Sequence, residues 1–410
     1  MSTLALPAQR EQLVGWACAQ AAANHSVSDC AACEWWAPPA LAPAQPRPLP
    51  PVSASPELAW FICLTAPTDD ERSSAHLDFA RASIVSARLN APNLAPHVIF
   101  LQTPDSQPGG PQSASARFLA WLRRASVRVV PHNLSFFDLI PPSKQRKPGG
   151  GGTGHLNVGA YCRLDVPQIV EELAPELAAR GIERERVLYT DTDVLFAADF
   201  EYARATRALP LPTFAAGSEV FSAAMNSGVM LINATTLRAE LPAMLRYATK
   251  RSFRFLTLDQ TWLAEWFAAA ADLAAKGKPP RAATPGWRPL DDDVYNARAF
   301  HHPTRRKRRG SAADAADAAV AEPRVWHWHG YKPHDVACWL RAMQSGVWPA
   351  RGWRDTKVPC RRGRCRWKPI HGSGCRYFGR IEMSPCYLRT YTYLLTQHLR
   401  MLSIADGLDT

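Results

Sequence analysis

Residues 186–196 read RVLYTDTDVLF, and this stretch decides which fold the sequence is expected to adopt. Two aspartates, Asp191 and Asp193, stand one residue apart between apolar residues of buried-strand character. Burying a carboxylate is costly unless a cation pairs with it. A metal ion is one explanation for the pair, and a turn at the end of a strand is the other.

The segments before this stretch alternate between strand-like and helix-like patterns. Continuous apolar runs at 57–66, 96–103 and 127–133 are typical of buried strands, and segments with helical spacing separate them. Such alternation predicts a parallel sheet with helices on its faces. The residues before Asp191 then form a fourth strand, so the two aspartates leave the sheet at its carboxyl edge, where ligands bind.

Composition shifts suggest how the chain is divided. The α/β pattern runs on through a strand at 227–233, a helix at 256–267 and a strand at 324–333. We therefore expect three parts: an N-terminal segment with a Pro-rich, partly disordered linker (1–56), an α/β domain (57–344) with a disordered insert (303–322), and a basic, Cys-containing extension (345–410).

The net charge of +12 is unevenly distributed. The run RRKRR at 305–309 and the stretch 351–386 carry it, so the body of the chain is near neutral and no specific nucleic-acid partner is expected. No apolar run approaches the ~18 residues of a membrane helix, and the N-terminus lacks a convincing signal peptide. The chain is expected to be soluble and cytoplasmic, or in the Golgi lumen if an anchor precedes it.

Ten cysteines are many for a cytosolic protein. Four of them cluster late with irregular spacing: Cys360, Cys365, Cys375 and Cys386. This pattern favours disulfides or free thiols, and His371 nearby leaves a zinc site as the alternative. Cys63 and Cys162 stand in apolar contexts and are predicted to be core residues.

In an extended segment alternate side chains share a face, so Asp191 and Asp193 can point the same way. Two carboxylates at a ligand edge form a site for Mg²⁺ or Mn²⁺ that diphosphate oxygens can complete. His327, in VWHWHGYKP, is the expected third ligand, and an imidazole favours manganese. His329 in the same segment is the competing candidate, and surface stacking on the neighbouring tryptophans is the structural alternative.

The ordered set YTDTD, MNSGVMLIN, LDQ, YN and HWHGYKP resembles glycosyltransferase family 8, which includes glycogenin and bacterial galactosyltransferases. The resemblance covers roughly residues 58–342. It implies a GT-A fold, which is a Rossmann-like mixed α/β sheet flanked by helices. It also implies a metal-dependent hexosyltransferase that uses a nucleotide-diphospho-sugar, with UDP as the expected nucleotide.

The resemblance assigns metal and phosphate roles to several residues. Asp193 would bind the metal, Asp191 would contact both the metal and the ribose, and His327 would complete the metal site. Gly330 and Lys332 would contact the diphosphate, and Lys332 would help to stabilise the leaving group.

The remaining roles concern the sugar and the nucleoside. Asp259 and Gln260 would face the transferred sugar as catalytic residues. The other donor contacts implied by the resemblance are Arg163, Asn226, Gly228, Thr65 and Ala66, the last two at the uracil and ribose. Without the resemblance, these residues have simpler interpretations. Arg163 would be a surface arginine paired with Asp165 or Glu171, and Asp259 would be a favourable charge at a helix N-terminus. The Asn226–Gly228 segment would be a turn before a strand.

The implied reaction transfers a hexose from a UDP-sugar to a glycan, protein or lipid acceptor with retention of anomeric configuration. One alternative is a non-catalytic nucleotide-sugar or glycan-binding protein of the same fold. Another is a haloacid-dehalogenase-type phosphatase, but Val194 stands where a D-G-T continuation is typical, and that motif normally opens its domain.

Overall fold

The computed structural model of the chain describes residues 49–50, 56–65, 71–102, 114–142, 156–206, 212–218, 225–255, 257–267, 286–298, 322–328, 368–369, 376–377 and 385–408. The predicted linker, insert and Cys-rich extension fall largely outside these residues, as do Ala66, His329, Gly330 and Lys332. The chain divides into two compact units, and the larger comprises Pro48–Ala297, Ala321–His327 and Ile404–Thr410. The predicted domain boundaries remain predictions.

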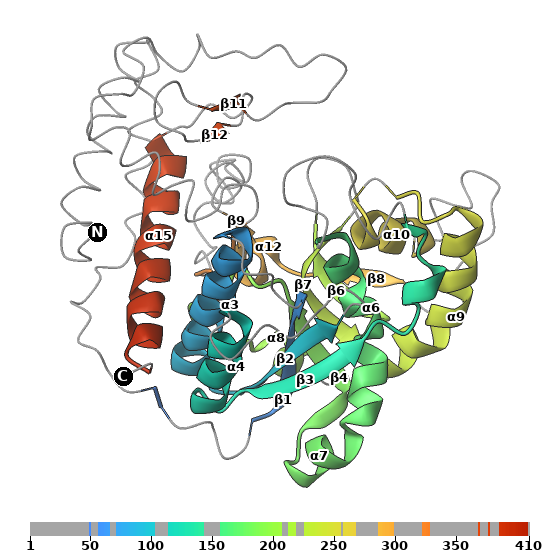
Figure 1. The fold of residues 1–410 in the computed structure, drawn as a ribbon, viewed down its shortest axis with the longest axis horizontal. Coiled ribbons are helices and arrows are strands. Elements are labelled where there is room, and N and C mark those ends of the chain that lie inside the picture. Colours follow the sequence, from blue (N-terminus) through green and yellow to red (C-terminus); the bar gives the residue numbers. More distant parts are fainter. Residues whose placement is uncertain are drawn as a thin grey trace, which may run out of the picture. The chain divides into compact units, whose positions relative to one another are not determined.

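The larger unit contains a seven-stranded mixed sheet in the order β3-β2-β1-β4-β7-β6-β8 (Figure 1). Its strands are β1 (Leu58–Thr65), β2 (Leu94–Gln102), β3 (Arg128–Asn133), β4 (Glu183–Thr190), β6 (Phe214–Gly217), β7 (Asn226–Asn233) and β8 (Trp287–Pro289). The first four pair in parallel, as the alternating pattern predicts. The mixed α/β fold class is thereby confirmed.

One strand departs from the purely parallel sheet that the alternation alone suggests. β7 runs antiparallel to both β4 and β6, whereas β6 and β8 pair in parallel. The segment between Gly217 and Asn226 is too short for the crossover that a parallel pair requires. β7 therefore enters the sheet at the edge where β4 ends, and its first residues lie beside Asp191.

Helices cover both faces of the sheet (Figure 1). The helices of the larger unit are α3 (Glu71–Asn90), α4 (Ala114–Arg124), α6 (Leu156–Glu172), α7 (Ala174–Ala179), α8 (Tyr202–Ala205), α9 (Ala234–Lys250), α10 (Asp259–Trp266) and α12 (Asp292–Tyr295), with a 3-10 turn η1 (Phe137–Leu139). A further helix, α15 (Pro385–Asp406), belongs mostly to the smaller unit. One buried cluster joins α6, α9 and α10 to alternate residues of β1, β4 and β7, such as Phe61, Tyr189 and Met230. α3 and α4 lie on the opposite face (Figure 1).

A second sheet has the order β5-β10-β9 and consists of β5 (Val194–Phe196), β10 (Val325–His327) and β9 (Ala297–Arg298). β4 ends at Thr190, so Asp191 and Asp193 lie in a bend between β4 and β5 rather than in an extended strand. β10 pairs antiparallel to β5 with His327 opposite Val194. This pairing places His327 next to the bend that contains Asp191 and Asp193.

The smaller unit includes Trp328–Ser403. Its described part contains most of α15, whose Tyr391 ring lies 6.0 Å from the ring of Trp328, and a short antiparallel pair of β11 (Lys368–Pro369) and β12 (Arg376–Tyr377). Within the part of the chain that the structure describes, no helix combines the length and the apolar character needed to cross a bilayer.

Candidate metal centre

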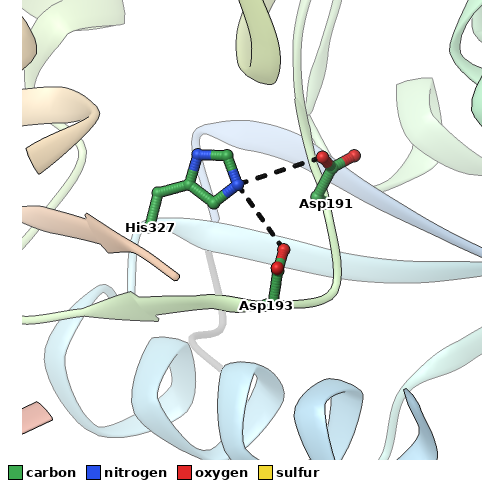
Figure 2. Close-up of side chains that lie close together, drawn as sticks. All are labelled: Asp191, Asp193 and His327. Carbon is green, nitrogen blue, oxygen red and sulfur yellow. Dashed lines mark ion pairs between the residues drawn. The ribbon is translucent and has the colours of Figure 1, made fainter. Parts of the chain in front are cut away.

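The side chains of Asp191, Asp193 and His327 converge on one point (Figure 2). Nε2 of His327 lies 3.5 Å from Oδ1 of Asp193 and 4.0 Å from Oδ2 of Asp191. One ligand atom from each residue fits within 4.8 Å of the others. His327 and Asp193 are buried, and Asp191 is partly exposed, so the cluster is open on the side of Asp191.

The two distances from Nε2 of His327 are compatible with a single octahedral ion. Two ligands at about 2.1 Å from one ion are about 3.0 Å apart at right angles and about 4.2 Å apart on opposite sides. The observed separations of 3.5 and 4.0 Å lie between those limits. Two carboxylates and one imidazole are a donor set that suits Mn²⁺ better than Mg²⁺.

Gly228 makes room for the histidine. A Cβ atom at this position would lie 2.1 Å from Cε1 of His327, which no real side chain can tolerate. The carbonyl of Gly228 accepts a hydrogen bond of 2.8 Å from the backbone N–H of Asp191. β7 thus fixes the start of the aspartate bend and leaves the space that the imidazole occupies.

Arg163, on α6, is the buried cation beside the cluster. Its Nη2 donates to Oδ1 of Asp191 at 2.8 Å, and its Nε lies 3.1 Å from Oδ2 of Asp259. Its Nη1 donates to the carbonyl of Ser227. Burial opposes the charge on Arg163, but the two carboxylates more than offset it and hold the pKa of the guanidinium above its usual range. The alternative interpretation of Arg163 as a surface arginine paired with Asp165 or Glu171 is therefore wrong.

Asp259 opens α10 and is 3% exposed. Burial raises the pKa of its carboxyl to about 6, although Arg163 acts in the opposite direction. Oδ2 of Asp259 also accepts a hydrogen bond of 2.9 Å from the hydroxyl of Ser227. Leu258, directly before it, has a φ of 53°, which is an unusual conformation for a branched side chain and directs Asp259 into the site.

The charges in this cluster do not balance. Asp191, Asp193 and Asp259 contribute three carboxylates, and Arg163 contributes one guanidinium. With all of these ionised and His327 neutral, these residues leave two negative charges in a largely buried space. A divalent cation among these residues would offset this local excess of negative charge.

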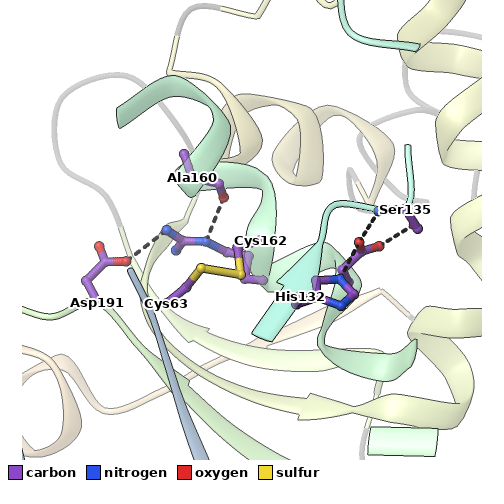
Figure 3. Close-up of a disulfide and its surroundings, with 8 residues drawn as sticks. Cys63, His132, Ser135, Ala160, Cys162 and Asp191 are labelled. Atoms are coloured by element: carbon purple, nitrogen blue, oxygen red, sulfur yellow. Dashed lines mark hydrogen bonds and ion pairs between the residues drawn. A yellow bond between two sulfur atoms is a disulfide. The ribbon is translucent and has the colours of Figure 1, made fainter. Parts of the chain in front are cut away.

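α6 is anchored on both sides of Arg163 (Figure 3). Cys162 forms a disulfide with Cys63 of β1, with the two Cα atoms 6.5 Å apart. Asp165 accepts hydrogen bonds from the backbone N–H and the hydroxyl of Ser135, each 2.6 Å, and lies 2.9 Å from Nε2 of His132. The prediction of Cys63 and Cys162 as core residues missed their bond, because a buried thiol and a buried disulfide have the same sequence context.

The structure brings most of the predicted site residues together. Asn226 and Gly228 begin β7, and Gln260 lies beside them with Oε1 3.4 Å from the backbone N–H of Ser227. Thr65 ends β1 at the same carboxyl edge of the sheet. Ala66, Gly330 and Lys332 lie outside the described residues, so their roles remain predictions.

Two functional candidates were missed by the sequence reasoning. Ser227 bridges Arg163 and Asp259 through its carbonyl and its hydroxyl. Asn296 is completely buried, and its Oδ1 lies 3.0 Å from Nδ1 of His327. Ser227 lies in the motif MNSGVMLIN and Asn296 in the motif YN, so both motifs were recognised but no role was predicted for these two residues.

The sequence matches no protein-family model and no curated protein. Among solved structures it resembles mouse xyloside xylosyltransferase 1 in its apo form, with 15% identity over 67% of this chain and 98% of that chain and a TM-score of 0.40. It also resembles the glycosyltransferase GlyE of Streptococcus pneumoniae TIGR4, with 15% identity over 67% of this chain and 57% of that chain and a TM-score of 0.38.

A third resemblance is to the bifunctional glycosyltransferase WbbM, with 15% identity over 70% of this chain and 48% of that chain and a TM-score of 0.37. The chain therefore matches only about half the length of GlyE and WbbM (57% and 48%). At these identities and TM-scores, the function has to be inferred from the site residues themselves.

Proposed function

We propose that the chain is a metal-dependent glycosyltransferase of family 8 that transfers a hexose from a UDP-sugar to an acceptor with retention of configuration. The observation that carries this proposal is the convergence of Asp191, Asp193 and His327 beside the Arg163–Asp259 pair, at the carboxyl edge of the sheet. Ligands of open α/β sheets bind at this edge.

Asp191 has two functions in this proposal because its two oxygens face different partners. Oδ1 is held by Arg163, and Oδ2 faces His327 and the metal position. Asp193 and His327 supply the remaining protein ligands. When bound, a divalent cation, with Mn²⁺ preferred, would stabilise the negative charge that develops on the departing diphosphate.

Asp259 is the residue best placed to face the transferred sugar. Arg163 and Ser227 both contact its Oδ2, so the carboxylate is held in place before any substrate arrives. With a pKa of about 6 it is ionised at neutral pH and can stabilise positive charge developing on the sugar. Gln260, Asn226 and Gly228 complete the sugar side in this proposal, and Thr65 and Ala66 the nucleoside side.

Gly330 and Lys332 belong to the proposal as diphosphate contacts. They follow His327 closely in sequence, so a bound diphosphate at the metal would lie within reach of this segment. Lys332 would add a positive charge to the leaving group.

The test is nucleotide release from a panel of UDP-sugars with Mn²⁺, with Mg²⁺ and with EDTA. We expect UDP release with at least one donor, dependent on the metal and lower by about a hundredfold or more in Asp193→Asn. Phosphatase activity without UDP release from any donor would identify the dehalogenase-type alternative. Metal-dependent UDP binding without turnover, in the presence of a broad acceptor panel, would identify the binding-protein alternative.

Retention is tested on the product. The anomeric proton coupling of the transferred hexose, measured by NMR in the first minutes of reaction, reports its configuration directly. We expect the α-configuration of the donor to persist in the product, and a β-linked product would refute the retaining mechanism.

A further inference from the structure

The buried amide of Asn296 contacts the imidazole of His327 at Nδ1, the ring nitrogen that faces away from the two aspartates. Nδ1 of His327 lies 3.0 Å from Oδ1 of Asn296, and the two residues are 3% and 0% exposed. We propose that Asn296 is a positioning residue that fixes His327 in the neutral tautomer with the proton on Nδ1, so that the lone pair of Nε2 points at the metal position. This inference rests on the metal site proposed above.

The orientation of the Asn296 amide follows from its other contacts. Its Nδ2 lies 3.3 Å from Oδ1 of Asn226 and 3.4 Å from Oδ1 of Asp292. Asn226 Oδ1 is an acceptor, because the backbone N–H of Gly228 donates to it at 3.2 Å. Two acceptors on one side of the amide require its NH₂ group to face them.

Asp292 is an acceptor for an equally clear reason. The backbone N–H of Ser218 donates to both of its carboxylate oxygens, at 2.9 and 3.1 Å. The carbonyl oxygen of Asn296 must therefore face His327, and only a protonated Nδ1 can donate to it. Rotating the amide by half a turn would place an oxygen against two oxygens and leave buried groups without hydrogen-bond partners, which is unfavourable.

The tautomer decides what Nε2 can do. A neutral imidazole carries one proton, so a proton on Nδ1 leaves a lone pair on Nε2. Nε2 is the atom that faces Asp191 and Asp193 (Figure 2). With the opposite tautomer, Nε2 would donate to the carboxylates and could not bind a cation.

Two glycines leave the space that the imidazole and the amide occupy. A Cβ atom at Gly217 would lie 2.0 Å from Nδ2 of Asn296 and 2.6 Å from Oδ1 of Asp292. A Cβ atom at Gly228 would strike the ring of His327. The imidazole of His327 thus packs closely on the backbone of Gly228, and the amide of Asn296 packs closely on the backbone of Gly217.

The first experiment needs no variant. The metal-free protein is labelled with ¹⁵N-histidine, and the ring nitrogen shifts are measured by NMR over a pH series that is extended upward until the shifts of His327 no longer change. His327→Ala identifies the signal. We expect the Nδ1-protonated tautomer for His327, and an Nε2-protonated ring would overturn the inference.

The second experiment measures Mn²⁺ affinity by electron paramagnetic resonance of the free ion. Asn296→Ala is expected to weaken Mn²⁺ binding by about 10–100-fold, which is typical when the hydrogen-bond partner of a ligand is lost. The matched control is Asn233→Ala, which removes a buried asparagine that caps α9 away from the site. Equal Mn²⁺ affinity in folded Asn296→Ala and the wild type would overturn the inference.

A double-variant cycle separates positioning from a general loss of structure. If Asn296 acts through His327, adding Asn296→Ala to His327→Ala changes the Mn²⁺ affinity no further. An additional tenfold loss in that background would contradict the assignment. If the wild type binds neither Mn²⁺ nor Mg²⁺, the proposed metal-dependent function fails, and the tautomer measurement still decides the role of Asn296.

Discussion

Nε of Arg163 lies 3.1 Å from Oδ2 of Asp259, and each side chain is only 5% exposed. This buried pair ties α6 to the first residue of α10. Because Arg163 also holds Asp191, one guanidinium connects the candidate metal ligands to the candidate sugar-facing carboxylate. The two halves of the proposed donor site therefore share a single charged residue.

Arg163→Lys is expected to impair the site although it keeps the charge. A lysine presents one ammonium group and cannot reproduce the planar fork that contacts Asp191, Asp259 and Ser227 at once. UDP release should fall by about a hundredfold, the effect of misplacing catalytic groups by roughly 1 Å. The control is Arg238→Lys, whose pair with Glu171 is exposed, and an equal effect of the two changes would argue against a special role for Arg163.

Asp193→Asn is expected to remove metal binding without unfolding the chain. The amide keeps the shape of the carboxylate but loses the negative charge that a divalent ion requires. Calorimetry should show no Mn²⁺ binding at concentrations that saturate the wild type, and UDP release should drop by about a hundredfold or more. Asp138→Asn, which changes an exposed carboxylate in η1, should leave both properties unchanged.

Gly228→Ala tests the steric argument at His327. The added methyl group would lie 2.1 Å from Cε1 of the imidazole, so the ring must move away from the two aspartates. We expect Mn²⁺ affinity to fall by at least about tenfold, the lower range for a disturbed ligand shell. At Gly286 the same substitution meets its nearest atom at 3.3 Å, so Gly286→Ala is the mild comparison. Wild-type Mn²⁺ affinity in Gly228→Ala would show that the ring is not confined as described.

Asp259 should make the stability of the metal-free protein depend on pH in an unusual direction. Its native pKa of about 6 lies above the unfolded value of 3.8, so between these values the native state holds a proton that the unfolded state has released. The free energy of unfolding of the wild type, relative to that of Asp259→Asn, should therefore fall as pH rises from about 4 to about 6. The total change is expected to be up to about 3 kcal/mol.

Urea denaturation of both proteins at several pH values measures this difference directly. Taking the difference between the two proteins removes the contribution of every other titrating group that they share. A constant difference across the range would mean that the carboxyl of Asp259 titrates normally in the native state.

The Cys63–Cys162 disulfide should stabilise the chain under oxidising conditions. It closes a loop with a sequence separation of 99 residues, for which loss of unfolded-state entropy predicts up to about 5 kcal/mol. A reductant should lower the midpoint of thermal unfolding of the wild type but not that of the double variant Cys63→Ala, Cys162→Ala. Equal sensitivity of both proteins to the reductant would assign the effect to other cysteines.

The same bond bears on where the protein works. Disulfides persist in oxidising compartments and are rare in the cytosol. A paired Cys63 and Cys162 would therefore argue against a reducing compartment. Alkylation of free thiols in intact cells, followed by peptide mass measurement, would show whether Cys63 and Cys162 are paired there.

The sequence was sufficient to predict the sheet edge and the aspartates. Apolar runs separated by helical segments indicate a parallel sheet, and the carboxyl ends of its strands meet at one edge, so Asp191 and Asp193 could be placed there. The antiparallel direction of β7 was harder to predict from the sequence, because it depends on the short connection from Gly217 to Asn226. Local patterns report which segments are strands and carry little information about their direction.

The contacts around His327 lay beyond what residue patterns can predict. The segment VWHWHGYKP indicated His327 as a ligand, but its strand pairing with Val194 joins distant segments and was not predicted. Asn296 has no periodic context, and its role depends on the side-chain acceptors Asn226 and Asp292. The bond between Cys63 and Cys162 likewise depends on α6 packing on β1. Each of these contacts depends on tertiary packing, and the local sequence does not determine which partner is used.

β10 has a consequence for how the molecule assembles. It supplies the third candidate metal ligand, yet the strand begins at Val325, far along the chain from Asp191 and Asp193. A chain that ends before this strand would contain Asp191 and Asp193 but could not form the centre. Mn²⁺ would therefore bind only the finished fold and stabilise it by mass action, by about 2.7 kcal/mol at a hundred times the Kd. Truncated or partly folded chains would not bind the ion. Metal binding would therefore indicate that folding is complete, in addition to preparing the site for the proposed reaction.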